Sequence, residues 1–128
     1  VYAVTRPAAG PSFAVLGQAV GAEWEHPADP PPVGRRLGPG TLRLAAGLAR
    51  IEFDTGATVT IEGPAEFRLD APDRAFLARG RMTAVCPPDA AGFRVGTPGG
   101  DLTDRGTAFG LAVDPGGASE VCVFQGAV

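Results

Sequence analysis

Apolar and polar residues alternate in short runs along most of the chain, and this pattern limits the fold more than any other feature of the sequence. In ARIEFDT, Ile51 and Phe53 alternate with acidic residues, and the same period of two recurs in ATVTIEG, AEFRLD, RMTAVC, TAFGLAV and EVCVF. A period of two places successive side chains on opposite faces of a β-strand. Each run ends at Gly, Pro or Asp, which are residue types that favour turns.

This pattern predicts an all-β fold of about ten short, mostly antiparallel strands in a two-sheet sandwich or roll. A short β-solenoid-like roll is the alternative arrangement. One stretch, GTLRLAAGLAR, approaches a helical periodicity, but it contains Gly47 and runs directly into a strand pattern. We therefore expect no long helix in the chain.

A chain of 128 residues is expected to form a single domain. Within it, residues 1–25 hold a first strand region, residues 26–40 form a proline-rich loop, and residues 41–128 form the main β body. The chain stops directly after a strand pattern. Whether the domain continues beyond Val128 is left open.

The residue types that are missing exclude several kinds of chemistry. All 11 basic residues are arginine, there is no lysine or asparagine, and there is one histidine. These counts exclude a Schiff-base lysine, a P-loop lysine and a multi-histidine metal site. The net charge is −3 and the arginines are dispersed, which argues against nucleic-acid binding. The two serines, Ser12 and Ser119, lie outside any nucleophile-elbow pattern.

The remaining acidic candidates also fit structural roles better than catalytic ones. Glu62 and Glu66 flank GPA and are candidates for the carboxylate pair of a glycosidase, but both occupy solvent-facing strand positions. Asp101 and Asp104 lack the ligand spacing of a calcium loop. We therefore predict no catalytic residue, no cofactor and no metal site.

Four further residues have a structural and a functional interpretation. Trp24, the only tryptophan, can fill the core or form a platform for a sugar ring. His26 precedes a proline in the loop, where we expect a solvated side chain. These two are the only binding candidates. Cys86 and Cys122 can form one disulfide, but we favour two separate thiols in small strand positions.

The glycine-rich run from GTPGG into DRGTAFGLAVD resembles a phosphate-binding loop only at first sight. Such a loop needs a helix N-terminus behind it, whereas the residues after GTPGG alternate like a strand. We interpret Gly106 as a bend that needs a positive φ and Gly110 as a mid-strand glycine. DPGG, from Asp114, then closes a hairpin.

Three motifs in order, EGPAEF, GFRVGTP and DRGTAFG, resemble the FecR family, the extracytoplasmic domain of bacterial sigma-factor regulators and related surface proteins. The resemblance runs from about Leu37 to Val128. The motif residues are of turn and core types, so we expect them to maintain the shape of the domain: Gly63, Pro64, Phe93, Thr97, Pro98, Gly106, Thr107, Phe109 and Gly110.

The resemblance implies a signal relay and not an enzyme. It implies a protein partner in the cell envelope and a periplasmic or cell-surface location, as a piece of a longer, membrane-anchored protein. Contact with the membrane would occur only through a segment absent from this chain. The alternative is a carbohydrate- or small-ligand-binding module centred on Trp24 and the loop from His26 to Gly34.

Overall fold

The computed structural model describes residues 12–25, 31–87, 92–104 and 108–125, and these residues form strands and turns without a helix. No helix among them could therefore span a membrane. The strands are β1 (Ala14–Trp24), β2 (Arg36–Leu37), β3 (Gly40–Phe53), β4 (Thr58–Ala71), β5 (Arg74–Val85), β6 (Arg94–Thr97), β7 (Gly100–Thr103), β8 (Ala108–Val113) and β9 (Ser119–Gln125).

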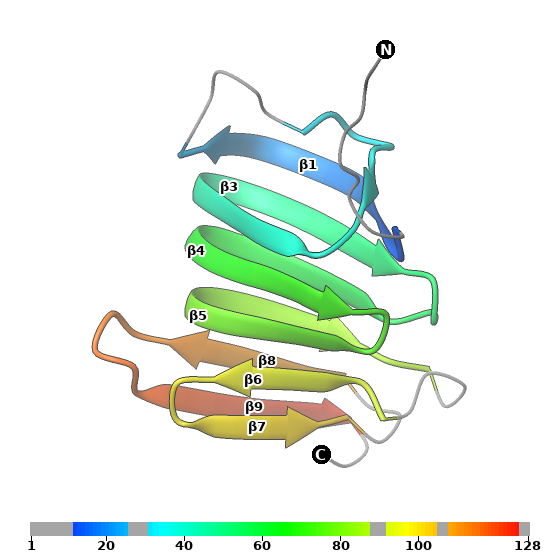
Figure 1. Cartoon of the computed structure of the whole chain (residues 1–128). Coiled ribbons are helices and arrows are strands. Elements are labelled where there is room, and N and C mark those ends of the chain that lie inside the picture. Colours follow the sequence, from blue (N-terminus) through cyan, green and yellow to red (C-terminus); the bar gives the residue numbers. More distant parts are fainter. Residues whose placement is uncertain (1–11, 26–30, 88–91, 105–107, 126–128) are drawn as a thin grey trace.

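The strands form one curled sheet that divides at β5. Its order is β2-β1-β3-β4-β5-β6-β7, and β8 and β9 branch from β5 on a second path. The first part of β5, 74–76, pairs in parallel with β6, whereas 80–85 pairs antiparallel with β8. The other strand pairs are antiparallel. Figure 1 shows β3, β4 and β5 as long stacked ribbons that each fold back on themselves.

Each long strand contributes its two ends to two facing layers of this roll. We call the layer that ends in β7 the β7 layer; it contains 40–44 of β3, 65–71 of β4 and 74–79 of β5. The β9 layer contains 14–20 of β1, 48–53 of β3, 58–62 of β4, 80–85 of β5, β8 and β9. The register shifts between Leu44 and Leu48, and between Glu62 and Glu66, where β3 and β4 bend.

Glycine makes these bends because neighbouring backbones lie where a side chain would be. Gly47 has a φ of +89°, and a Cβ built there would overlap the Gly21 carbonyl and lie 2.7 Å from the Ala22 nitrogen. Gly80 has a φ of +109°, and its Cβ would lie 2.7 Å from the Pro64 carbonyl oxygen. The bends of successive strands therefore stack in direct backbone contact, which requires residues without a side chain.

The core lies between the two layers. Phe67 of the β7 layer and Ile61 and Phe109 of the β9 layer are fully buried. At the end near the β3–β4 turn, the Phe53 ring packs edge-to-face on Phe93 with centroids 4.8 Å apart. Phe53 is buried too, as predicted, while the predicted core position Val123 lies among the residues whose side chains are not described.

The all-β prediction is confirmed, and the curled sheet fits the roll better than a flat sandwich. Two details of the prediction are wrong. The Gly63–Pro64 peptide, which is cis, lies inside β4 and not in a turn between two strands. The segment 26–40 contains β2, which pairs with β1 and continues the sheet. The first error arises because a bent strand has the same alternation on either side of its bend; the second arises because β2 has only two residues, too few to form an alternating pattern.

Candidate functional site

The motif residue Thr97 holds the β6–β7 turn. Its side chain is buried, its hydroxyl oxygen accepts a hydrogen bond from the Gly99 N–H at 3.1 Å, and the hydroxyl donates to the Gly100 carbonyl at 2.9 Å. The run GTPGG therefore leads into strand β7, and within the described ranges no helix N-terminus follows it. This arrangement agrees with a hairpin and not with a phosphate-binding loop.

The β8–β9 turn is held by Asp114 in a similar way. One carboxylate oxygen of Asp114 accepts hydrogen bonds from the N–H groups of Gly116 at 2.9 Å and Ala118 at 3.0 Å. Gly117, with a φ of +94°, closes the turn by donating its N–H to the Asp114 carbonyl at 2.9 Å. A Cβ on Gly117 would lie 3.4 Å from Pro98, so this turn packs against the β6–β7 turn.

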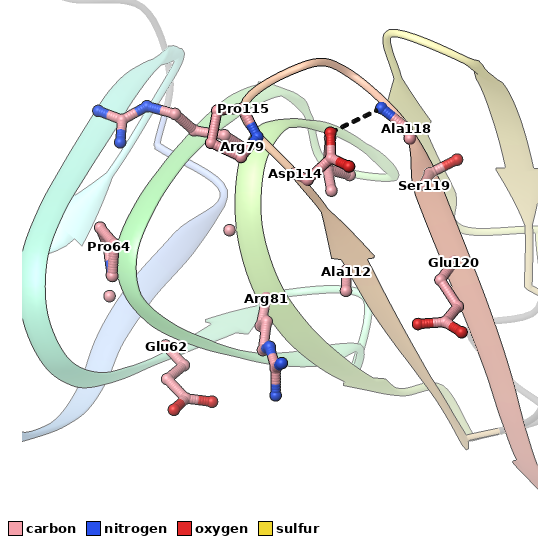
Figure 2. A pocket seen from close by; sticks show the side chains of 13 residues that line it. Glu62, Pro64, Arg79, Arg81, Ala112, Asp114, Pro115, Ala118, Ser119 and Glu120 are labelled. Carbon is pink, nitrogen blue, oxygen red and sulfur yellow. Dashed lines mark hydrogen bonds between the residues drawn. The ribbon is translucent and has the colours of Figure 1, made fainter.

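Behind the β8–β9 turn lies an open groove of about 480 Å³, formed where β5 bends and β8 leaves it (Figure 2). Its lining includes Arg79, Arg81 and Glu62 on one side and Asp114 and Glu120 on the other. The groove is therefore of mixed charge, with Ala112 and Pro64 supplying apolar surface. Among the described residues, no group of three or more His, Cys, Asp or Glu side chains could hold a metal ion.

Glu62 and Glu66, the candidate carboxylate pair, lie in different environments. Glu62 lies opposite Arg81 in the β9 layer and lines the groove. Glu66 lies beyond the bend of β4, where it pairs with Arg43 at 3.8 Å and Arg79 at 3.7 Å. Arg79 also pairs with Glu25 at 2.8 Å. Glu66 therefore belongs to a surface ion-pair network.

Asp101 and Asp104 also lie in different environments. Asp101 is exposed on β7, 3.9 Å from Arg74. Asp104 is fully buried; its N–H donates to the Phe93 carbonyl at 2.8 Å, and its own carbonyl accepts from Gly92 at 2.6 Å. The burial of this carboxyl was not predicted from the sequence. The only indication in the sequence was that Asp104 is the first residue of the DRGTAFG motif.

The two cysteines are separate thiols. Cys86 is buried and Cys122 is exposed, and both are free. Burial, followed by a hydrogen bond and the charge of Asp104, raises the pKa of the Cys86 thiol to about 12. The Cys86 thiol is therefore protonated at neutral pH and shielded from reagents.

Trp24 lines a smaller pocket at the other end of the sheet. It is partly buried at the end of β1, where it packs against the core and lies opposite Leu44 of β3. The pocket has a volume of about 250 Å³. Its lining is Trp24, Pro31, Arg35, Leu37, Thr41, Leu42 and Arg43. The other binding candidate, His26, lies outside the described residues, as do the motif residues Gly106 and Thr107.

Strand β9 is the terminal strand of its layer: among the described residues it pairs only with β8. Val121 is 41% exposed, although Leu111 directly opposite it on β8 is 3% exposed. The described side chains of Ser119, Glu120 and Cys122 are exposed as well. This end of the roll therefore presents apolar surface together with an open strand edge.

The hydrogen-bond pattern shows which residues of β9 face the open edge. Asp114 donates its N–H to the Ala118 carbonyl at 2.9 Å, so these two form a hydrogen-bonded pair. Such pairs alternate along an antiparallel ladder. Glu120 and Cys122 therefore direct their backbone groups toward β8, and Val121 directs its N–H and carbonyl outward.

Comparison with known proteins identifies the family. The family model described as FecR protein matches residues 41–128, the part of the chain that contains β4 to β9 and all the motifs above. Neither a curated protein nor a solved structure matches the chain. Because the family model covers more than half of the sequence, this chain belongs to the FecR family.

Proposed function

We propose that this chain is the non-enzymatic, extracytoplasmic sensor and interaction module of a FecR-type sigma-factor regulator, which passes a surface signal to an envelope protein by direct contact. The observation that carries the proposal is the FecR family match over residues 41–128. The family is regulatory, and its motif residues in this chain hold turns and core. The surfaces around them are thus left for recognition.

The open edge of β9 supports a specific mode of contact. An extended segment of a partner can add a strand to a free edge, where main-chain hydrogen bonds supply affinity. Val121 offers its outward N–H and carbonyl and a side chain that is 41% exposed. Of the residues that line the groove in Figure 2, Ser119 and Glu120 belong to β9 and lie next to the side chains of an added segment.

A proline substitution tests this mode without breaking the existing sheet. Val121→Pro removes an N–H that faces the open edge, and edge strands tolerate proline there. Val121→Ala is the matched control, because it shortens the side chain but keeps the N–H. We expect the envelope partner to be retained by Val121→Ala and lost from Val121→Pro. Equal binding by both variants would refute strand addition.

The exposed thiol of Cys122 supplies a second measurement. Cys122 is accessible and Cys86 is buried, so a thiol reagent modifies one defined site next to Val121. Bound partner should slow the alkylation of Cys122 severalfold. Hydrolysis of generic ester, phosphate or glycoside substrates by the purified chain would instead contradict its assignment as a non-enzyme.

A further inference from the structure

The side chains of strand β9 indicate which kind of segment its open edge accepts, an inference that rests on the proposed contact at that edge. Val121 lies opposite Leu111, a core residue that is 3% exposed, so Val121 points to the inner face of the sheet. Glu120 lies opposite Ala112 and points to the outer face, because successive residues of a strand alternate between faces. An added segment therefore meets an apolar side chain and a carboxylate in successive positions.

On the inner face, the side chain of Val121 is only partly covered. It is 41% exposed, whereas Leu111 and Val113 of β8 are each 3% exposed and have a strand on either side, β5 and β9. An apolar residue opposite Val121 on an added strand would cover this side chain, and apolar cross-strand pairs stabilise a sheet. We therefore expect an apolar residue at that position of the segment.

On the outer face, Glu120 is exposed and forms no ion pair within the part of the chain that the structure describes. Arg81 belongs to the same row across the sheet, but Ala112 lies between it and Glu120 (Figure 2). Two strand spacings of about 4.8 Å separate the backbones of Arg81 and Glu120, roughly 10 Å in all. The neighbouring position on an added strand lies about half as far from Glu120. A cation at that position therefore compensates the carboxylate better than Arg81 does.

The hydrogen-bond pattern of the edge strengthens this preference when the segment adds in the antiparallel direction. All the described strand pairs except β5–β6 are antiparallel. Because Val121 directs its N–H and carbonyl outward, the residue opposite it forms a hydrogen-bonded pair with it. The residue opposite Glu120 then occupies a non-hydrogen-bonded position, where the Cα atoms are about 4.5 Å apart and the side chains lie closer together. Attraction and repulsion between charges are strongest there.

We propose that the β9 edge selects an extended segment of the partner in which an apolar residue, opposite Val121, is followed by lysine or arginine, opposite Glu120. The order follows from the antiparallel direction, since the residue after the apolar one lies opposite the residue before Val121. A segment with an acidic residue in the second position is disfavoured because two carboxylates would lie side by side. The edge thus distinguishes partner segments by the charge at one defined position.

The test uses peptides that differ at one position. The first is Thr-Val-Thr-Val-Lys-Val-Thr with a dye on its N-terminus and an amidated C-terminus; its lysine lies beside Glu120 when its second valine lies opposite Val121. Matched peptides carry glutamine or glutamate in place of lysine. Fluorescence anisotropy should show that the chain binds the lysine peptide about fivefold more tightly than the glutamate peptide, with glutamine in between. Added salt should reduce the difference because Glu120 is exposed.

The requirement for an apolar residue is tested in the same assay. The lysine peptide with serine in place of its second valine should bind severalfold more weakly, because serine leaves Val121 uncovered. Equal binding of the serine and valine peptides would overturn this requirement. Equal binding of the lysine and glutamate peptides would overturn the charge preference, and failure of every peptide to bind at millimolar concentration would overturn both.

Charge-reversal variants complete the test. Glu120→Lys should invert the preference, so that the glutamate peptide binds more tightly than the lysine peptide. Glu23→Lys, at an exposed position of β1, makes the same change in net charge far from β9 in the strand order and should keep the wild-type preference. An unchanged preference in Glu120→Lys, or inversion in both variants, would refute selection at Glu120.

Val121→Pro separates this inference from the proposed contact on which it rests. This variant should lose all the peptides, because it lacks the outward N–H of β9. If Val121→Pro binds them as the wild type does, strand addition itself is wrong. If Val121→Pro loses them but the wild type does not discriminate between lysine and glutamate, only the charge preference is overturned.

Discussion

Substitution of Gly47 by alanine tests how the roll is built. Gly47 has a φ of +89°, and its absent Cβ would overlap the Gly21 carbonyl of β1. Gly34 is a matched control, because its φ is +93° and a Cβ there would meet nothing within 4 Å. Both variants introduce the same methyl group at nearly the same backbone angle. Only Gly47→Ala forces β1 and β3 apart.

The expected free energies of unfolding follow from these two effects. A left-handed conformation costs an L-residue about 1–2 kcal/mol, and replacing glycine returns about 0.4–1 kcal/mol through the unfolded chain. Gly34→Ala should therefore destabilise the chain by about 1 kcal/mol or less. Gly47→Ala adds an overpacking cost of about 1–3 kcal/mol because the obstacle is backbone. Its total should reach about 2–4 kcal/mol.

Urea unfolding measures the difference directly. Trp24 fluorescence reports on the end of β1, close to Gly21, and circular dichroism reports on the whole sheet. The midpoint for Gly47→Ala should fall well below that for Gly34→Ala, with an unchanged slope. Equal midpoints for the two variants would refute direct backbone contact as the reason for glycine at the bends.

Three other substitutions test the core, the turn and the buried thiol. Phe109→Ala should destabilise the chain by about 3–5 kcal/mol because Phe109 is fully buried; a loss below about 1 kcal/mol would contradict this packing. Thr97→Val should cost about 1–3 kcal/mol in thermal unfolding, because the Gly99 N–H and Gly100 carbonyl lose their partner. The pKa of Cys86 is raised from 9.0 to about 12, so the unfolded chain releases this proton first and stability should fall as pH rises above 9. Cys86→Ala should remove that part of the pH dependence, and an unchanged slope would show that other groups cause it.

Much of the fold can be predicted from the alternation of residues such as Ile51 and Phe53, because burial of one strand face follows directly from a period of two. The bends cannot. Gly47 and Gly80 look like isolated glycines inside strand patterns, and only the stacking of their neighbours' backbones explains them. The division of the sheet at β5 cannot be predicted from the sequence either, since the two halves of β5 show the same alternation of residues.

The site was predictable only in part. The residue type of Trp24 makes it a binding candidate, but the sequence does not predict that Arg35 and Arg43 line the same pocket. They reach the pocket because β1 pairs with both β2 and β3, and this long-range pairing leaves no local pattern in the sequence. The open edge of β9 depends in the same way on which strand has no second neighbour.

The proposed function requires that this chain relays a signal by protein contact at the edge of β9. Transcription can be measured from a promoter that depends on the sigma factor under the proposed regulator's control, in cells that carry the full regulator with Val121→Pro or Val121→Ala. We expect Val121→Pro to abolish induction while the protein stays at its normal level in the envelope, and Val121→Ala to retain induction. Normal induction by Val121→Pro would contradict the claim.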